Sequence, residues 1–428
     1  MGRYRIQGGN RVAGELSVGG AKNSILPILA AVCLNKGESI IHNCPRIADT
    51  FLSIEILKHI GCRVVFSGNT LWINASGINE INIPNDYVKE MRSSILFMGA
   101  MLGRTGQVNI ANPGGCDLGE RSIGYHLDGL TAMGATIKHI DGTMHCTGSL
   151  KGANIYLQSA SVGATENLML AATLAKGPTT ITNAAKEPEI VDLARFLKSM
   201  GADIRGAGTS KITVEGTSNL ESATHEVMPD RIVAGTYLTA AAMTRGDINV
   251  TDISPKDLIV VTAKLTQMGC KISYGPTSIR LKAPERLKAL EYLETSEHPG
   301  FPTDMQSQLV AALSIADGHS TVKERIFDNR HSHAVGLRLM GADVKTQQVI
   351  IGTDPKKEIT LFDIHGKPEL EGATVEAKDL RCGAALVLAG LAAGGETIVQ
   401  NAKYVERGYE NIEKALTEVG ADIQLEEA

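Results

Sequence analysis

The chain has 428 residues, which is enough for two or three domains with large hydrophobic cores. Its composition is 43% hydrophobic and 21% charged, and its net charge of −5 gives no overall attraction to nucleic acid or anionic lipid. Aromatic residues make up 4% of the chain, with one tryptophan, which argues against a surface that stacks nucleic-acid bases.

The opening residues and the cysteines predict a cytoplasmic protein. The first 20 residues lack the apolar core of a signal peptide, and the longest apolar run, near CGAALVLAGLAAGG, is too short to span a bilayer. The seven cysteines are an odd number and form no CxxC pair, which fits reduced thiols. His331 and His333 lack a third ligand at a suitable spacing, so we expect no metal.

The predicted elements recur six times along the chain. Each repeat contains a leucine, three further residues, a glycine and a small residue, which indicates a helix that ends at a left-handed glycine and precedes a strand. The segments are LKHIGC (57–62), LTAMGA (130–135), LKSMGA (197–202), LTQMGC (265–270), LRLMGA (337–342) and LTEVGA (416–421).

A second signature accompanies the first in every repeat. It is a helix that is apolar on nearly every face, followed by a glycine that opens a short strand and then by a polar loop. A helix without a polar face is buried on all sides, so each repeat supplies one inner helix. The helical segments are SILPILAAVCL, SILFMGAML, NLMLAATLA, IVAGTYLTAAAM, SQLVAALSIA and GAALVLAGLAA.

Six such repeats predict an α/β protein with two domains of three repeats each. We expect three buried helices at the centre of each domain, surrounded by sheets and outer helices. The opening segment RYRIQGG…GELSVGG resembles the strands of the other repeats and is expected to complete the second domain. We therefore assign 22–228 to one domain and 1–21 plus 229–428 to the other, and a cleft between two domains is a usual ligand site.

Cations at the starts of inner helices need an explanation. Lys22, Arg92 and Arg381 stand where the helix dipole favours an anion. An anion held jointly by the backbone N–H groups and these side chains is the economical explanation, because the three positions are equivalent in the repeat. The alternative for any one of them is a solvated charge.

The polar loops add further candidates. Arg121, Arg330 and Arg407 lie in these loops, as does Cys116, while the loop of the third repeat carries glutamates, Glu187 and Glu189. Six cations in a net acidic chain indicate a multiply anionic substrate. Neither GxxxxGK[ST] nor a GxGxxG after a strand is present, which argues against kinase and dinucleotide functions. A cysteine considered alone is most often a small buried residue.

Several motifs together resemble the UDP-N-acetylglucosamine 1-carboxyvinyltransferase family, nearly from end to end. They are GGAKNSILPILAA, PGGCDLG, SVGATEN, EPEIVDLARFL, MPDRIVAGTYL, GFPTDMQ and ERGYENIE. The resemblance implies two inside-out α/β barrels of three repeats each, the enolpyruvyl transferase fold. Shikimate enolpyruvyl transferases share that fold, but their glycine- and arginine-rich motifs are not seen here.

The resemblance also implies a reaction. The enolpyruvyl group of phosphoenolpyruvate moves to the 3′-hydroxyl of UDP-N-acetylglucosamine, and phosphate leaves through a tetrahedral intermediate. This is the first committed step of peptidoglycan synthesis, on which cell shape and division depend. No cofactor is implied, and fosfomycin is the expected inhibitor. The resemblance indicates no oligomeric state.

The resemblance assigns roles to individual residues. Cys116 is the general acid, Asp304 is the base on the 3′-hydroxyl, and Lys22 completes the catalytic set. The loop 111–122 closes over the substrate. The residues implied for phosphoenolpyruvate are Lys22, Asn23, Arg92, Arg121, Arg381 and Arg407. The residues implied for the UDP-sugar are Asn23, Arg92, Arg121, Ser161, Val162, Gly163, Asp304, Ile326 and Arg330.

The chain departs from the family pattern at two positions. Ser122 and Gly124 stand where the family has proline and aspartate, beside the uracil. Three interpretations therefore stay open: the transferase described above, an enolpyruvyl transferase with another nucleotide or sugar-nucleotide acceptor, and a weakly active paralogue that binds the UDP-sugar and regulates.

Overall fold

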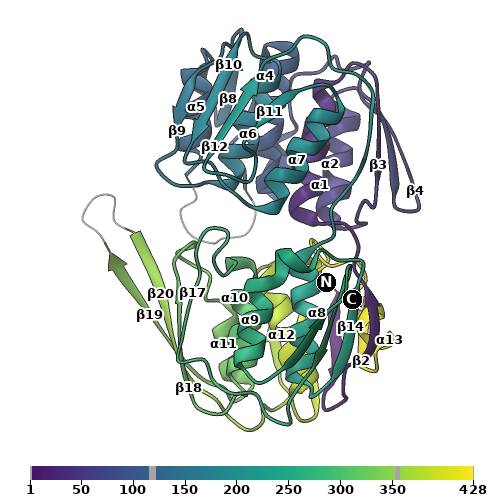
Figure 1. Cartoon of the computed structure of the whole chain (residues 1–428), viewed down its shortest axis with the longest axis vertical. Helices are drawn as coiled ribbons and strands as arrows, with labels where there is room; N and C mark the ends of the chain where they lie inside the picture. Colours follow the sequence, from purple (N-terminus) through teal and green to yellow (C-terminus); the bar gives the residue numbers. More distant parts are fainter. Residues whose placement is uncertain (1, 115–121, 352–356, 428) are drawn as a thin grey trace. The chain divides into compact units, whose positions relative to one another are not determined.

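The computed structural model describes residues 2–114, 122–351 and 357–427. The described chain divides into two compact units, each of which is considered by itself (Figure 1). Unit 1 contains the residues up to Gly19 and those from Pro229 onward, and unit 2 contains the described residues from Gly20 to Met228. Cys116 and Arg121 lie outside the described residues.

Six buried helices form the interior of the two units. Almost every residue in them is inaccessible to solvent, which confirms the prediction made from their apolar sequences. In unit 2, α4 packs against both α1 and α6, and in unit 1, α12 packs against both α8 and α10. The inner helices are α1 (Lys22–Ala31), α4 (Leu96–Thr105), α6 (Val162–Thr173), α8 (Arg231–Met243), α10 (Gln306–Leu313) and α12 (Leu380–Ala392).

Six outer helices end where the repeat predicts. The glycine after each has φ between +87° and +108°, a conformation that residues with a Cβ rarely adopt. The outer helices are α2 (Ala48–His59), α5 (Gly124–Ala132), α7 (Pro188–Ser199), α9 (Ile259–Gln267), α11 (His333–Leu339) and α13 (Ile412–Glu418). The remaining described helices are α3 (Asn85–Glu90), η1 (Val32–Leu34), η2 (Arg92–Ile95), η3 (Pro255–Leu258), η4 (Thr303–Met305) and η5 (Ala402–Tyr404).

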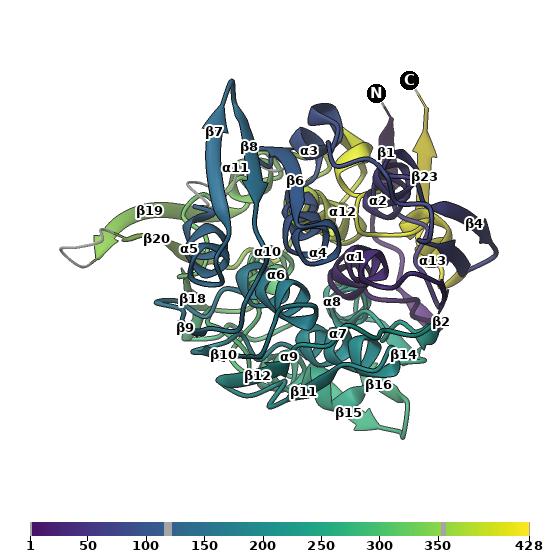
Figure 2. The same ribbon diagram turned by 90° about the horizontal axis from the view of Figure 1, so that it is seen from above.

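Each unit carries three small sheets outside its helices (Figures 1 and 2). In unit 2 the strand orders are β13-β3-β5-β4, β11-β12-β10-β9 and β6-β8-β7. The strands of this unit are β3 (Glu38–His42), β4 (Arg63–Ser67), β5 (Thr70–Asn74), β6 (Gln107–Ala111), β7 (Thr136–Ile140), β8 (Thr143–Thr147), β9 (Asn154–Tyr156), β10 (Pro178–Thr182), β11 (Asp203–Arg205), β12 (Lys211–Glu215) and β13 (Ala223–Glu226).

In unit 1 the strand orders are β21-β22-β1-β23, β15-β16-β14-β2 and β17-β18-β20-β19. Its strands are β1 (Arg3–Gln7), β2 (Ala13–Ser17), β14 (Asp247–Thr251), β15 (Lys271–Tyr274), β16 (Ser278–Lys282), β17 (Tyr292–Glu294), β18 (His319–Glu324), β19 (Asp343–Ile351), β20 (Lys357–His365), β21 (Thr374–Glu376), β22 (Glu396–Gln400) and β23 (Asp422–Glu426). β1 lies between β22 and β23, so the first strand joins the last repeat.

The sheets stay separate in the part of the chain that the structure describes, so neither unit contains a sheet closed into a barrel. The inside-out character of the fold comes from helices at the centre and sheets around them. In that same part of the chain, no helix combines the length and the apolar composition that a membrane span requires.

Two segments of unit 2 that lie next to its boundaries are hydrogen-bonded to each other. The amide of Ala21 donates to the carbonyl of Met228 at 2.8 Å. The carboxylate of Asp192, on α7, accepts from the Met228 amide at 3.1 Å and from the Ser24 hydroxyl at 2.5 Å. The start of α1 and the end of unit 2 are therefore tied together by one buried side chain.

Candidate functional site

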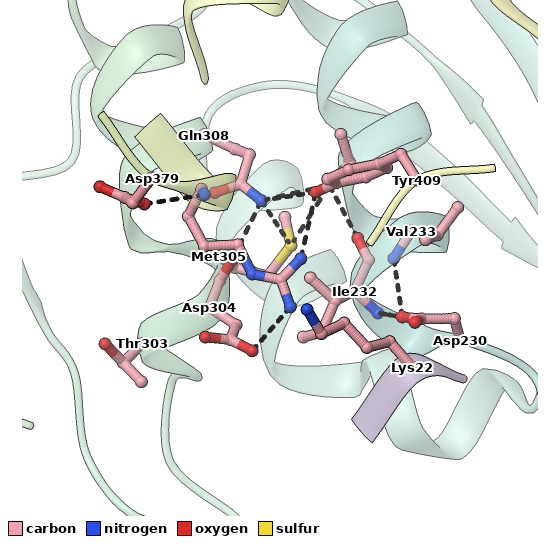
Figure 3. A network of polar contacts seen from close by, with 12 residues as sticks. Lys22, Asp230, Ile232, Val233, Thr303, Asp304, Met305, Gln308, Asp379 and Tyr409 are labelled. Atoms are coloured by element: carbon pink, nitrogen blue, oxygen red, sulfur yellow. Dashed lines mark hydrogen bonds and ion pairs between the residues drawn. The ribbon is translucent and has the colours of Figure 1, made fainter. Parts of the chain in front are cut away.

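The carboxylate of Asp304, which is labelled in Figure 3, lies between two arginines in unit 1. Arg330 donates to Oδ1 and Arg381 donates to Oδ2, both at 2.8 Å. The side chains of both arginines are 5% exposed, so their charges are poorly screened by water. Burial opposes the charge of Asp304, but the two guanidinium groups outweigh it and hold the pKa of the carboxyl well below its usual range.

Arg381 is held by the start of its helix. Asp379 is the N-cap of α12, and its carboxylate accepts hydrogen bonds from the amides of Arg381 at 2.9 Å and Cys382 at 3.0 Å. Burial disfavours the guanidinium charge, yet Asp304 and the other neighbours raise the pKa of Arg381 above its usual value. The pair with Asp304 therefore stays ionised at neutral pH.

A buried carboxylate that sequence reasoning missed organises the loop carrying Arg330. Oε1 of Glu324 accepts from the Thr295 hydroxyl at 2.9 Å and from the Ile326 amide at 2.7 Å. Its other oxygen accepts from the Thr303 hydroxyl at 2.9 Å, in the turn that carries Asp304. Glu324 is fully buried. It ties the loop of the sugar-binding candidates to the turn of the proposed base.

Arg407 belongs to the same unit as this pair. It is half-buried and lies in the turn between η5 and α13, two residues before the fully buried Tyr409. Unit 1 thus contributes Asp304, Ile326, Arg330, Arg381 and Arg407 from the predicted site.

Lys22 of unit 2 also has a protein carboxylate as its partner. Its Nζ lies 2.6 Å from Oδ2 of Asp49 on α2, and the two side chains are 11% and 5% exposed. Lys22 and Arg381, two of the cations at helix starts, are thus each paired with a carboxylate of the protein. The repeat could have identified Asp49. This residue lies eight positions before Leu57, and another acidic residue, Glu189, lies eight positions before the equivalent Leu197.

The start of α6 carries three of the residues expected to contact the UDP-sugar. Ser161 is the N-cap and accepts a hydrogen bond from the Ala164 amide at 3.3 Å. Val162 and Gly163 follow in the first turn, and a Cβ on Gly163 would lie 3.4 Å from the ring of His126. This helix start is half-buried and has no acidic residue in its first turn.

His126, on α5, is a neutral neighbour of this helix start. Burial first, and then the charge of Arg92, lower the pKa of His126 to about 4. Its Nδ1 accepts from the amide of Asn167 at 3.0 Å, and the Asn167 oxygen accepts from the Gly99 amide at 2.8 Å. Unit 2 thus contributes Lys22, Asn23, Arg92 and the Ser161–Gly163 turn.

The two positions that depart from the family motif contact each other. The hydroxyl of Ser122 accepts a hydrogen bond from the amide of Gly124 at 3.0 Å, where α5 begins.

The two glutamates that the sequence placed in the polar loop of the third repeat belong to the start of a helix. Glu187 is the N-cap of α7, and Glu189 is buried in its first turn.

One group in the described residues could supply three metal ligands. It consists of His319, Asp363 and His365 on the neighbouring strands β18 and β20. Each of these side chains is about half exposed, and none belongs to the predicted site. The hydrogen bond from His319 keeps the pKa of Asp363 below its usual range.

Comparison with known proteins places the chain in a family. The family model for EPSP synthase (3-phosphoshikimate 1-carboxyvinyltransferase) matches residues 6–416. The UDP-N-acetylglucosamine 1-carboxyvinyltransferase 2 of Caldanaerobacter subterraneus subsp. tengcongensis is 50% identical over 424 residues, covering 99% of both chains. The UDP-N-acetylglucosamine 1-carboxyvinyltransferase 1 of Symbiobacterium thermophilum is 48% identical, covering 98% of this chain and 94% of the relative.

Solved structures show the same fold. The enolpyruvyl transferase NikO from Streptomyces tendae superposes with a TM-score of 0.85 at 24% identity, covering 99% of this chain and 98% of the other. EPSP synthase from Acinetobacter baumannii gives a TM-score of 0.72 at 19% identity, covering both chains completely. The repeats, the inner helices and these matches agree, and the chain belongs to the UDP-N-acetylglucosamine 1-carboxyvinyltransferase family of enolpyruvyl transferases.

Proposed function

We propose that this chain transfers the enolpyruvyl group of phosphoenolpyruvate to the 3′-hydroxyl of UDP-N-acetylglucosamine and releases phosphate. The observation that carries the proposal is the ionised carboxylate of Asp304, held between two buried arginines. Relatives that are 43–50% identical over nearly the whole chain carry the name of this activity. The product is the first committed precursor of peptidoglycan.

Asp304 is the proposed base on the 3′-hydroxyl. Its low pKa keeps it ionised, but it also makes the carboxylate a weak proton acceptor. An anionic substrate beside Arg330 and Arg381 offsets part of their positive charge, so the pKa of Asp304 rises when substrate binds. The base is thus strengthened when the hydroxyl is present.

Cys116 is the proposed acid. In the addition step the sugar oxygen bonds to C2 of phosphoenolpyruvate while a proton is delivered to C3, which gives the tetrahedral intermediate. In the elimination step the C–O bond to phosphate breaks and C3 loses a proton, which restores the double bond. Lys22, Arg121 and Arg407 are proposed to hold the phosphate and carboxylate, and such fixed charges stabilise the intermediate without a metal or cofactor.

The start of α6 is the proposed site for the phosphates of the nucleotide. Its cap, Ser161, is neutral, so the N–H groups of the first turn keep their partial positive charge for an anion. Ile326, in the loop tied down by Glu324, is proposed to contact the same ligand.

The test is phosphate release from phosphoenolpyruvate with two acceptors, UDP-N-acetylglucosamine and UMP. Release with the sugar nucleotide alone is expected. Release with UMP alone would show that the chain uses another acceptor. This alternative is tested because Ser122 and Gly124 replace the proline and aspartate of the family. Binding of the sugar nucleotide without release would indicate a regulator.

Cys116→Ala is expected to reduce turnover by about 100-fold or more, since general acid catalysis contributes about 10²–10⁴. Cys116→Asp should retain part of the rate, because a carboxylic acid also delivers a proton. Fosfomycin should label Cys116 irreversibly, which mass spectrometry of the digested protein measures. Unchanged turnover in Cys116→Ala would exclude the acid role.

A further inference from the structure

The hydroxyl of Tyr409 contacts one side chain from each inner helix of unit 1. It lies 2.9 Å from the hydroxyl of Thr236 on α8, 3.2 Å from Nε2 of Gln308 on α10 and 3.4 Å from Nη1 of Arg381 on α12 (Figure 3). Tyr409 itself is 1% exposed. A single buried phenol therefore joins the three central helices at the end where Asp304 lies.

The chemistry of the partners determines the direction of each hydrogen bond. The amide nitrogen of Gln308 and the guanidinium of Arg381 can only donate, so the Tyr409 oxygen accepts from both. The hydroxyl of Thr236 donates to the carbonyl of Ile232 at 2.8 Å, which leaves its oxygen to accept the phenolic proton. Nε2 of Gln308 also lies 3.2 Å from the Thr236 oxygen, so the amide and the two hydroxyls form one connected cluster of donors and acceptors.

The network holds Asp304 through two sets of hydrogen bonds. Arg381 donates from Nη2 to Asp304 at 2.8 Å and from Nη1 to Tyr409, so both ends of its planar guanidinium are held. Gln308 also donates to the backbone carbonyl of Asp304 at 3.0 Å. The side chain and the backbone of the proposed base are thus both linked to the same phenol.

The turn that carries Tyr409 packs directly on α12. A Cβ built on Gly383 of α12 would lie 2.5 Å from Cγ2 of Val405, which is fully buried. Only a glycine lets this turn approach the helix so closely. Because Arg407 lies between Val405 and Tyr409, the phenol and the glycine together set the position of that arginine's backbone.

We propose that Tyr409 is a positioning residue for the enolpyruvyl transfer, holding Arg381 and Asp304 in their reactive geometry and seating Arg407. This inference rests on the proposed function. Tyr409 touches no substrate because it is buried, and it acts through the residues that it orients. Loss of this orientation raises the barrier to the reaction and therefore lowers the rate.

The experiment is Tyr409→Phe, which removes one oxygen and keeps the ring. The expected result is a fall in kcat of about tenfold, with a smaller rise in KM for phosphoenolpyruvate because Arg381 and Arg407 lose part of their alignment. Tyr4→Phe is the matched control. It removes the hydroxyl of another fully buried tyrosine of unit 1, and no described contact joins Tyr4 to Arg381 or Asp304. It should leave kcat unchanged.

Variants at Thr236 distinguish positioning from general loosening. Thr236→Val removes the acceptor of the phenolic proton and should lower kcat, whereas Thr236→Ser keeps the hydroxyl and should retain it. In the Tyr409→Phe background, Thr236→Val should lower kcat by a smaller factor than it does alone, because the bond between the two hydroxyls is already absent and only the one from Gln308 to Thr236 remains. Equal kcat in wild type and Tyr409→Phe, or additive losses, would overturn the inference. A wild-type chain that releases no phosphate would instead overturn the proposed function.

Discussion

The inner helices of the two units differ in whether an aspartate stands at their start. In unit 1 an aspartate stands at each start: Asp230 caps α8, Asp304 precedes α10 and Asp379 caps α12. In unit 2 the same places have no acidic residue: α1 begins at Lys22, η2 begins at Arg92 and α6 is capped by Ser161. The repeat makes these positions equivalent, so the two halves have diverged in charge while keeping the fold.

This difference suggests a division of labour. Carboxylates at helix starts neutralise the dipole, so in unit 1 the helix ends are satisfied and Asp304 can serve as a base. In unit 2 the starts are electropositive, which suits the phosphate groups of both proposed substrates. Lys22 is the exception that needs a protein carboxylate, Asp49, from a neighbouring helix.

The largest expected effect comes from removing the acidic group that precedes α10, so that this helix start resembles the starts in unit 2. Asp304→Asn removes the proposed base and leaves two buried guanidinium groups without their anion. Turnover should fall by about 100-fold or more, while the affinity for inorganic phosphate rises, because Arg330 and Arg381 are released. Steady-state phosphate release and calorimetric titration with inorganic phosphate measure the two effects.

Asp230→Asn is the matched control for this change. Its carboxylate accepts from the Ile232 and Val233 amides at 2.8 and 3.0 Å, and asparagine caps a helix about as well. We expect turnover within a few-fold of wild type. If both aspartates gave equal losses, the distinction between the base and the caps would be wrong.

A second effect concerns acid stability in unit 2. The pKa of His126 falls from its ordinary 6.5 to about 4 on folding, so between these values the unfolded chain binds more protons than the folded one. The contribution of His126 to the free energy of unfolding is present above pH 6.5 and is lost as pH falls toward 4, by about 3 kcal/mol in total. His126→Gln should flatten this dependence in urea titrations at pH 7 and 4.5; an unchanged slope would contradict it.

The smallest expected effects are the changes in unfolding free energy caused by alanine at two helix glycines, one in each unit. Gly383→Ala in unit 1 forces a Cβ to within 2.5 Å of Val405 and should cost about 1–3 kcal/mol of unfolding free energy, together with turnover. Gly103→Ala in unit 2 meets its nearest neighbour, Leu34, at an ordinary 3.5 Å and should stabilise the chain by about 0.5–1 kcal/mol. Urea unfolding of both variants measures the signs, and equal signs would show that the Val405 contact is unimportant.

Much of the architecture was predictable because its signals are local. A glycine after Leu57 or Leu197 ends a helix through its own backbone conformation, and an apolar segment such as 380–392 must be buried wherever it packs. The candidate residues came from the repeat and from the family motifs, which also operate over short stretches of sequence.

The polar partners of those residues were not predictable in the same way. Asp304 and Arg381 are 77 residues apart, and Thr236 and Tyr409 are 173 apart. Many carboxylates and hydroxyls of similar sequence context exist, and only the packing of α8, α10 and α12 selects which of them meet. Glu324 was missed for this reason, since its sequence looks like an ordinary strand end.

The amino-acid sequence by itself determined the six repeats, the buried helices, the left-handed glycines and the family, because backbone preference and hydrophobic burial act within each segment. The tertiary structure decided the charge states of the site. Whether Asp304 is paired with two arginines, Lys22 with Asp49 or His126 with Asn167 depends on distances between segments far apart in the chain. Electrostatic energies depend on those distances and on burial, and neither is a property of a local sequence.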